Sequence, residues 1–414
     1  MSDSVTEQNE QPEETPPTPR MELREGLPPV VETDEALAAA AAAIAAGSGP
    51  VAIDAERASG YRYSNRAYLI QLRRDGSGTH LIDPIPLSTL APLADALAGT
   101  EWILHAATQD LPCLAEVGLR PDHLFDTELA GRLLGYPRVG LATLVETVLG
   151  YSLAKEHSAV DWSTRPLPEP WLMYAALDVE MLIELRAALA EQLEKAGKAE
   201  WAAEEFEALR GFAVQEKVDP WRRTSGMHRV RGRRGLANVR ALWNLRNEIA
   251  TDRDVTPGRV LPDSAIVAAA MAAPTDRRAL LSTKGFHGRG AKRYAARWVE
   301  ALAEAAGLSE AELPQRAPRG DGPPPPRAWV EKNPAAAKRL SQARAELTAL
   351  SERLEVPAEN LMTPDTLRRV LWSPPASGSA DDVAAALRAL GAREWQIEQV
   401  GPIVVAAIAD ARAD

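Results

Sequence analysis

The chain of 414 residues is long enough for two to four domains, and its composition excludes several classes of protein. A single cysteine, Cys113, excludes an internal disulfide and favours a reducing compartment, and the six histidines form no His/Cys cluster with zinc spacing. The formal net charge of −11 argues against a nucleic-acid enzyme until its distribution is considered. Residues 1–35 carry ten acids against Arg20 and Arg24, so the remaining chain has a net charge of only −3.

The N-terminal segment is acidic and rich in proline. Residues 1–22 are expected to form a disordered acidic tail, since they have few apolar side chains. They contain neither the basic region nor the apolar region of a secretory signal. The longest apolar run, residues 36–46, is mostly alanine and much shorter than the roughly 20 residues that span a bilayer. It predicts a surface helix, and we expect a cytoplasmic protein with no membrane partner.

Residues 23–215 are predicted to form an α/β domain with a mixed sheet, because three consecutive strands precede a mixture of helices and strands. The strands are expected near residues 50–56, 67–74, 79–83 and 101–106. The helices are expected near residues 87–98, 110–117, 127–135, 141–149, 169–196 and 199–212.

Four carboxylates and one tyrosine stand beside apolar runs of this domain, where an unpartnered charge is costly. Asp54 and Glu56 are two residues apart in a predicted strand, so their side chains share a face. Asp110 follows another predicted strand. Tyr174 and Asp178 are four residues apart in a predicted helix and also share a face.

These residue types suit a divalent metal site. Two carboxylates on one strand face repel each other unless a cation or a proton lies between them. Carboxylate oxygens are preferred ligands of Mg²⁺ and Mn²⁺, and a two-metal site that cleaves phosphodiester bonds requires several of them. Each pair alone is a weak signal, because Asp-x-Glu pairs and Tyr–Asp pairs also occur on solvated surfaces. The joint pattern carries the prediction.

The segments around these residues resemble, in order and spacing, the three exonuclease motifs of the DEDD superfamily of 3′→5′ exonucleases, in its tyrosine subclass. The resemblance is closest to the ribonuclease D family. Further segments contribute to it: residues 68–72, 81–84, 105–111, 125–127 and 161–167. The likeness runs from about residue 25 to residue 210 and resumes in the C-terminal part. Residues 57–61 depart from the family pattern.

The resemblance implies a ribonuclease H-like fold, with the first two carboxylates on its first, central strand. It implies a metal-dependent 3′→5′ exoribonuclease that releases 5′-mononucleotides. Asp54, Glu56, Asp110 and Asp178 are expected to bind two Mg²⁺ or Mn²⁺ ions about 3.5–4 Å apart. Tyr174 is expected to orient the attacking water, and Glu56 to contact the terminal 3′-hydroxyl. The implied partner is RNA with a free 3′ end, such as a transfer-RNA precursor, and we expect a monomer.

Three alternatives stay open at this stage. His105 is either a substrate-binding residue near the scissile phosphate or a buried, hydrogen-bonded histidine, and we favour the second interpretation. The chain could instead be a 3′→5′ DNA exonuclease, since no residue that distinguishes ribose from deoxyribose is identifiable. It could also be a catalytically silent RNA-binding protein, although the presence of all four carboxylates and the tyrosine favours activity.

Residues 216–235 are predicted to form a basic linker. They lack apolar periodicity, and between residues 217 and 234 only Asp219 opposes seven basic side chains: Lys217, Arg222, Arg223, Arg229, Arg231, Arg233 and Arg234. Such a segment favours contact with a phosphate backbone. The last four of these arginines are the candidates for RNA binding, and a merely solvated linker is the alternative.

Two small all-α domains are predicted at residues 236–313 and 329–414, separated by a Pro-rich linker at residues 314–328. The N-terminal one of the two resembles the HRDC domain shared by RecQ helicases and ribonuclease D, and the C-terminal one resembles a diverged copy of it. The HRDC-like domain ends in basic residues interleaved with aromatic ones, a combination that suits single-stranded nucleic acid. Its candidate RNA ligands are Arg289, Lys292 and Arg293, whereas Phe286 and Trp298 are predicted to lie in its core.

Overall fold

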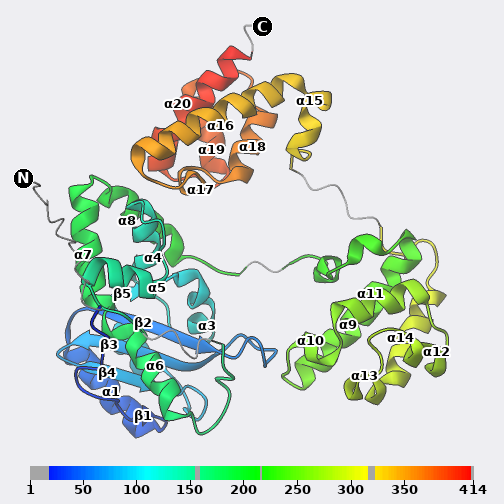
Figure 1. The fold of residues 1–414 in the computed structure, drawn as a ribbon, viewed down its shortest axis with the longest axis horizontal. Coiled ribbons are helices and arrows are strands. Elements are labelled where there is room, and N and C mark those ends of the chain that lie inside the picture. Colours follow the sequence, from blue (N-terminus) through cyan, green and yellow to red (C-terminus); the bar gives the residue numbers. More distant parts are fainter. Residues whose placement is uncertain (1–17, 154–158, 215–216, 316–321, 412–414) are drawn as a thin grey trace, which may run out of the picture.

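The computed structural model describes residues 18–153, 159–214, 217–315 and 322–411 (Figure 1). They form one α/β domain and two helical domains. Most of the predicted acidic tail lies outside the described residues. Where its end is described, Arg20 forms a parallel β-bridge with Ser152. Within these described ranges, no helix combines the length and the apolar character that a membrane crossing requires.

The α/β domain contains a mixed six-stranded sheet with the order β1-β4-β3-β2-β5-β6. Its strands are β1 Val30–Val31, β2 Ser48–Arg57, β3 Ala67–Asp75, β4 Gly78–Ile82, β5 Glu101–Leu104 and β6 His123–Asp126. Strand β2 pairs antiparallel with β3 and parallel with β5, so it is central. It is the second strand of the chain rather than the first, because the short β1 precedes it. Strands β1 and β6 were not predicted, since so few residues show no clear periodicity.

The helices of this domain are α1 Asp34–Ala46, α2 Ala91–Leu97, α3 Leu111–Glu116, α4 Thr127–Leu133, α5 Leu141–Leu144, η2 Val145–Leu149, α6 Glu169–Glu180, α7 Leu182–Lys195 and α8 Ala199–Arg210, with the 3₁₀ turn η1 Ala107–Gln109. The predicted surface helix α1 buries Leu37 and Ile44 in a core. The expected continuous helix over residues 169–196 is broken at Met181.

The alternation along β2 determines where its carboxylates point. Val51, Ile53 and Ala55 are buried in the core that includes side chains of α1 and α2. Ala52 belongs to the core on the other face, together with residues of α6 and α7. Asp54 and Glu56 are in phase with Ala52, so they face the helix α6 that crosses the sheet (Figure 1).

The first helical domain begins earlier in the chain than expected. Its elements are η3 Pro220–Arg223, η4 Met227–Arg229, α9 Gly232–Asp252, α10 Pro257–Val260, α11 Asp263–Ala272, α12 Arg277–Ser282, α13 Arg289–Arg293 and α14 Ala295–Gly307. Trp221 is buried in the same core as Phe286 and Trp298, two residues that the sequence predicted to lie there. Most of the expected linker at residues 216–235 therefore packs on this domain, because the indole of Trp221 anchors it.

The second helical domain repeats the order of a long helix followed by a one-turn helix. Its elements are η5 Pro326–Ala328, α15 Trp329–Lys332, α16 Pro334–Leu354, α17 Ala358–Leu361, α18 Pro364–Trp372, α19 Ala380–Ala389 and α20 Glu394–Asp410. Helices α9 and α16 each contain 21 residues, and each leads through a proline into the one-turn helix α10 or α17.

The second helical domain docks on α8 and shares a hydrophobic core with the α/β domain. The indole of Trp395 stacks on Trp201, with ring centroids 4.9 Å apart, and donates through Nε1 to Glu205 Oε1 at 3.0 Å. The ammonium group of Lys198 donates to the carbonyls of Leu133 and Leu354, both at 2.7 Å. These contacts fasten the C-terminal domain to the α/β domain.

We expect Trp395→Ala to destabilise the protein by about 3–5 kcal/mol, the usual range for a buried tryptophan. The change removes an indole that is 1% exposed and leaves the buried carboxylate of Glu205 without that donor. Thermal unfolding followed by circular dichroism measures the effect, and Trp201→Phe, which keeps an aromatic ring in the stack, is the control. An unchanged melting temperature for Trp395→Ala would contradict the docking described above.

Candidate active site

Three carboxylates converge where the end of β2 meets the last turn of α6. One oxygen each from Asp54, Glu56 and Asp178 lies within 4.8 Å of the other two. In the described part of the chain, these three side chains form the one group that could jointly bind a metal ion. The strand supplies two ligands through its alternation, and α6 supplies the third from the segment that crosses the sheet.

Asp110 lies at the edge of this cluster and lines the same cleft. Its side chain is 7% exposed, and its Oδ1 lies 3.8 Å from Nη2 of Arg57. The structure therefore brings all four predicted carboxylates to one cleft but leaves Asp110 outside the tight group of three. Arg57 is the one cation among the described residues that line this cleft.

A second buried aspartate fixes the turn that leads to Asp110. The carboxylate of Asp126 accepts hydrogen bonds from the amides of Ala106 at 3.3 Å, Ala107 at 2.7 Å and Leu129 at 2.9 Å. Ala106 has a φ of 58°, a left-handed conformation that costs a non-glycine residue about 1–2 kcal/mol. The hydrogen bonds of Asp126 hold this turn in place, and Asp126 was absent from the predicted site.

The signal for Asp126 was present in the sequence. The residue directly precedes the predicted helix over residues 127–135, which is the N-cap position where aspartate is preferred. In the structure it is indeed the N-cap of α4. Asp126 also accepts hydrogen bonds from the turn before Asp110, which lies 19 and 20 residues earlier in the chain. No local sequence pattern predicts these contacts.

Burial and mutual repulsion raise the pKa values of the whole cluster. Burial raises the pKa of Asp54 to about 6. Burial, together with the charges of the other three carboxylates, raises the pKa of Glu56 to about 10. Burial and the charge of Asp54 also raise the pKa values of Asp110 and Asp178 well above their usual range. Without a cation this site therefore retains protons near neutral pH, and a divalent cation would replace them.

Tyr174 lies one helical turn before Asp178 and lines the cleft. Its hydroxyl donates a hydrogen bond to the Asp178 carboxylate. Burial and the neighbouring carboxylates raise the pKa of this phenol above its usual value. In the metal-free protein the hydroxyl is therefore protonated at physiological pH.

His105 combines both interpretations of the sequence, because it is hydrogen-bonded and also lines the cleft. Its Nδ1 lies 2.9 Å from Thr127 Oγ1, and that hydroxyl donates to the carbonyl of Leu104 at 3.2 Å. The histidine Nδ1 must therefore carry the proton, which leaves Nε2 as an acceptor. Burial lowers the pKa of His105 to about 4, so the ring is neutral at physiological pH.

The cleft that contains the four carboxylates adjoins a second hollow. The cleft has a volume of about 260 Å³, and the second hollow has about 330 Å³. They share Ala55, Glu56 and Arg57, so Glu56 lies between them. Tyr61 and its neighbours in the chain form one wall of the second hollow. A larger hollow of about 520 Å³ lies between α9 and α14, but it contains none of the clustered carboxylates.

Comparison with known proteins identifies the family. Residues 28–194 match the model of a 3′-5′ exonuclease domain, residues 236–302 an HRDC domain, and residues 322–408 a 3′ to 5′ exonuclease C-terminal domain. The chain is 33% identical over 308 residues to the ribonuclease D of Acidiphilium cryptum, a match that covers 72% of this chain and 77% of the relative. This chain belongs to the ribonuclease D family. It is a hydrolase with a 3′-5′ exonuclease domain.

Solved structures extend the match over nearly the whole chain. A protein from Bifidobacterium adolescentis superimposes with a TM-score of 0.86 at 37% identity, covering 94% of this chain and 98% of that one. Escherichia coli RNase D, described as an exoribonuclease involved in structured RNA processing, superimposes with a TM-score of 0.67 at 28% identity. That match covers 87% of this chain and 98% of the other.

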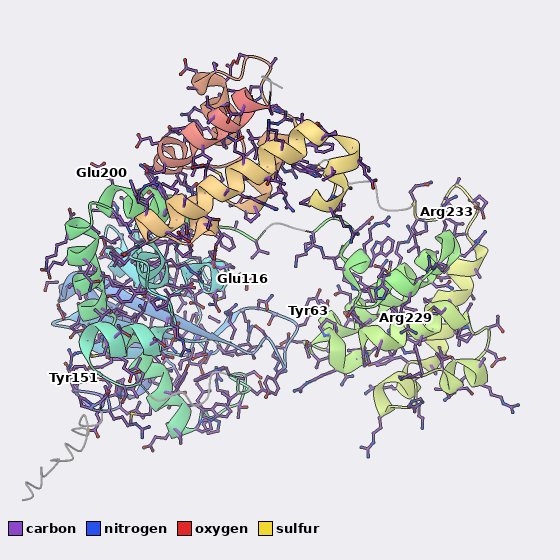
Figure 2. The ribbon with its side chains drawn as sticks, turned by 45° about the horizontal axis from the view of Figure 1, so that its top comes forward. Tyr63, Glu116, Tyr151, Glu200, Arg229 and Arg233 are labelled. Carbon is purple, nitrogen blue, oxygen red and sulfur yellow. The ribbon has the colours of Figure 1, made fainter. Side chains whose placement is uncertain are left out.

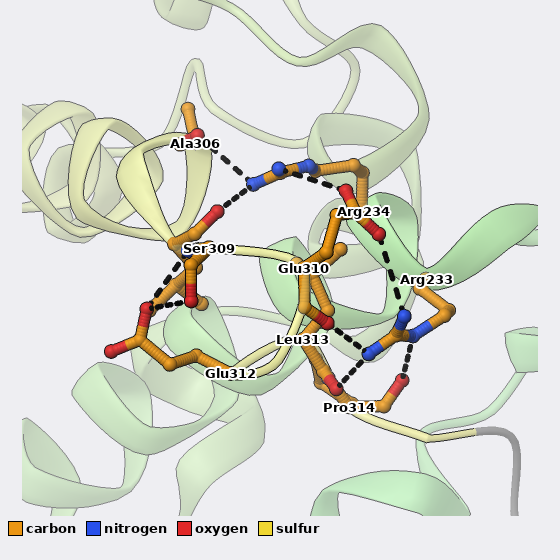
Figure 3. Close-up of polar contacts among 9 residues, drawn as sticks. Arg233, Arg234, Ala306, Ser309, Glu310, Glu312, Leu313 and Pro314 are labelled. Carbon is orange, nitrogen blue, oxygen red and sulfur yellow. Dashed lines mark hydrogen bonds and ion pairs between the residues drawn. The ribbon is translucent and has the colours of Figure 1, made fainter.

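Two of the four arginines predicted to contact RNA have structural partners instead. Arg234 donates through Nη1 to the carbonyls of Ala306 and Leu308 at the end of α14, at 3.1 and 2.5 Å (Figure 3). Arg233 donates through Nη2 to the carbonyls of Glu310 and Leu313, at 2.5 and 2.8 Å. Both also pair with the Glu310 carboxylate. These two guanidinium groups satisfy carbonyls at and just beyond the end of α14, so Arg229 and Arg231 are the stronger candidates for RNA contact.

The remaining basic candidates are exposed. Arg229 and Arg231 precede α9 and make no side-chain hydrogen bond or ion pair within the described residues. Arg289, Lys292 and Arg293 lie on the short helix α13, and all three are exposed. Figure 2 shows Arg229 and Arg233 on the HRDC domain, well separated from each other. The exposed candidates stay available for a polyanion.

Proposed function

We propose that this protein is a metal-dependent exoribonuclease that removes nucleotides one at a time from the 3′ ends of RNA. The observation that carries the proposal is the convergence of three carboxylate oxygens within 4.8 Å, with Asp110 beside them, in a chain of the ribonuclease D family. We further propose that its substrates are structured RNAs with unpaired 3′ tails, such as transfer-RNA precursors. The support for this step is the description of Escherichia coli RNase D, a relative that matches 87% of this chain.

The donor set fits two divalent cations of the Mg²⁺ or Mn²⁺ type. Asp54, Glu56, Asp110 and Asp178 offer only oxygen ligands, and burial raises the pKa values of all four in the metal-free protein. Arg57 alone cannot neutralise four carboxylates. When bound, such cations would lower the pKa of a water nucleophile and stabilise charge on the leaving oxygen.

The other residues of the cleft would position the substrate and the water. Tyr174 would orient the attacking water with a phenol that remains protonated. Glu56 would accept a hydrogen bond from the terminal 3′-hydroxyl, since it lies between the cleft and the second hollow. This contact would make cleavage depend on a free 3′ end. His105 would present a neutral Nε2 acceptor to the cleft, fixed in orientation by Thr127.

A cleavage assay tests the proposal. A 5′-labelled RNA with a folded body and an unpaired 3′ tail is incubated with Mg²⁺, with Mn²⁺ and with EDTA, beside a DNA of the same sequence and an RNA blocked by a 3′-phosphate. We expect a metal-dependent ladder that shortens from the 3′ end of the unblocked RNA only. Equal cleavage of the DNA would instead indicate a DNA exonuclease, and tight RNA binding without cleavage would indicate a silent binding protein.

The exposed arginines should contribute to RNA affinity through phosphate contacts. We expect the double variant Arg229→Ala/Arg231→Ala to weaken the binding of single-stranded RNA. The slope of log K against log salt should become less steep by about 1.4, since each phosphate contact contributes about 0.7 to this slope. Binding is measured by fluorescence anisotropy between about 50 and 200 mM salt, the interval where such contacts have large effects.

The neighbouring pair provides a matched control for this measurement. Arg233→Ala/Arg234→Ala removes the same charge from the same segment, but it should lower the melting temperature and leave the salt slope unchanged, because these side chains bind the end of α14. The assignment is wrong if the first double variant keeps the wild-type slope.

A further inference from the structure

The loop between β2 and β3, residues 58–66, belongs to the exonuclease domain and makes non-covalent contacts with the HRDC domain. Figure 2 shows Tyr63 of this loop where the two domains meet. The carboxylate of Asp254, just after α9, accepts hydrogen bonds from the amides of Tyr63 at 3.1 Å and Ser64 at 3.0 Å, and from the hydroxyl of Tyr68 on β3 at 3.3 Å. One HRDC side chain thus binds both the loop and the strand that follows it.

Three further contacts fix the loop on either side of Asp254. The amide of Thr256 donates to the carbonyl of Tyr61 at 3.1 Å. The hydroxyl of Tyr63 donates to Asn247 Oδ1 on α9 at 3.1 Å. The guanidinium of Arg259 lies 4.5 Å from the ring centroid of Tyr61, a distance typical of a cation–π contact. The HRDC domain therefore contacts the loop through both backbone and side-chain atoms.

The backbone at Asp254 is itself unusual. Its φ of 43° is left-handed, which is uncommon for a residue other than glycine although aspartate and asparagine tolerate it best. A strained residue persists only where the surrounding structure fixes it, and such residues concentrate at functional sites. Partial burial opposes ionisation of Asp254, but hydrogen bonds from Ser64 and Tyr63 outweigh it and lower the pKa, so the carboxylate is ionised when it binds the loop.

The same loop forms part of the catalytic region. It follows directly after Glu56 and Arg57, and Ser59, Gly60 and Tyr61 line the second hollow beside Glu56. The Tyr61 hydroxyl donates to the carbonyl of Ala159, which also lines this hollow, at 3.3 Å. The position of Tyr61 therefore sets the shape of the hollow, and Thr256 and Arg259 of the HRDC domain contact Tyr61 directly.

We propose that Asp254 is a positioning residue through which the HRDC domain fixes the β2–β3 loop, and thereby the hollow that receives the 3′-terminal nucleotide of RNA. The inference rests on the exoribonuclease function proposed above. It assigns the HRDC domain a role in the rate of cleavage in addition to RNA affinity. If the HRDC domain only bound RNA, a change in it would alter the apparent Kd or KM and leave the maximal rate of the bound complex unchanged.

The variant Asp254→Asn tests this role with little disturbance of the backbone, because asparagine also tolerates a positive φ. It removes the charge and one acceptor oxygen from the contact with Tyr63, Ser64 and Tyr68. Asp252→Asn is the matched control, since Asp252 is exposed two residues earlier and makes no side-chain hydrogen bond or ion pair within the described residues. The full-length proteins are compared under single-turnover conditions over a range of enzyme concentrations, with 5′-labelled tailed RNA.

We expect Asp254→Asn to lower the maximal single-turnover rate by roughly tenfold to a hundredfold, the effect of a misplacement of about 1 Å in a reacting complex. The Asp252→Asn control should keep the wild-type rate. Tyr68→Phe removes one donor of the same contact, so it should have a smaller effect, and its combination with Asp254→Asn should be non-additive. An unchanged maximal rate for Asp254→Asn, with or without a raised KM, would overturn the proposal.

Amide hydrogen exchange supplies a readout that does not depend on activity. The amides of Tyr63 and Ser64 donate to Asp254, so they should exchange faster in Asp254→Asn than in Asp252→Asn. Unaltered exchange at both amides would also overturn the proposal. If the wild-type protein cleaved no RNA while the exchange changed as expected, the loop contact would stand and the proposed exoribonuclease function would fail.

Discussion

Asp54→Asn should lower the maximal rate of RNA cleavage about a thousandfold, because a catalytic metal ion contributes several kcal/mol and each 1.4 kcal/mol is about a factor of ten. The substitution removes a proposed anionic ligand from the group formed with Glu56 and Asp178, while the neutral amide keeps the side-chain shape. Single-turnover cleavage of 5′-labelled RNA at saturating Mg²⁺ measures the loss, and Asp178→Asn should give a loss of similar size.

A surface carboxylate provides the control for this prediction. Asp95 is exposed on α2, outside the residues that line the cleft, so Asp95→Asn should cleave at the wild-type rate. Circular dichroism should show the same helix content in all three variants. Retention of most of the activity by Asp54→Asn or Asp178→Asn would show that the metal site is assigned to the wrong residues.

The metal-free protein should lose stability as the pH rises, and Asp54→Asn should remove part of this loss. The folded state raises the pKa of Asp54 to about 6 and that of Glu56 to about 10, whereas unfolded carboxyl groups titrate near 4. Between these values the folded state binds more protons than the unfolded state, so the free energy of unfolding decreases with pH. The contribution is fully present below about pH 4, and the part due to Asp54 is lost as the pH rises through about 6.

The expected size of the Asp54 effect is on the order of 3 kcal/mol, since each pKa unit corresponds to about 1.4 kcal/mol. Calorimetric melting in EDTA at about pH 5, 7 and 8.5 measures it. The variant Asp54→Asn should melt at a higher temperature than the wild type at neutral pH, and the difference should shrink toward pH 5. Mg²⁺ should stabilise the wild type more at high pH, because protons then compete less for the ligands. A difference that does not change with pH would contradict the raised pKa values.

Local patterns in the sequence were sufficient to predict the main elements of the site. The two-residue spacing of Asp54 and Glu56 on a strand determines that they share a face, and the four-residue spacing of Tyr174 and Asp178 on a helix has the same consequence. Apolar runs identified β2, β3, β4 and β5. The order of the motifs then identified the family, which the match to ribonuclease D of Acidiphilium cryptum confirms.

What the sequence did not reveal depends on contacts between distant residues. The turn before Asp110 needs Asp126, some 20 residues later in the chain. The contact between Ser64 and Asp254 joins residues 190 positions apart in the chain, and no periodicity in either segment predicts it. The sequence of the basic run that ends with Arg233 and Arg234 is typical of a phosphate-binding segment. In the structure these two side chains bind carbonyls at and just beyond the end of α14. In each case a charged side chain satisfies backbone groups that only the tertiary structure brings close.

The most direct test of the central claim is anomalous diffraction from crystals of the wild-type protein soaked with Mn²⁺ and a 5′-mononucleotide. Two anomalous peaks among the carboxylates of Asp54, Glu56, Asp110 and Asp178 are expected, and neither peak should appear in crystals of Asp54→Asn and Asp178→Asn combined. Peaks located elsewhere, or a cleft that binds the nucleotide without any metal ion, would contradict the two-metal site on which the proposed exoribonuclease activity depends.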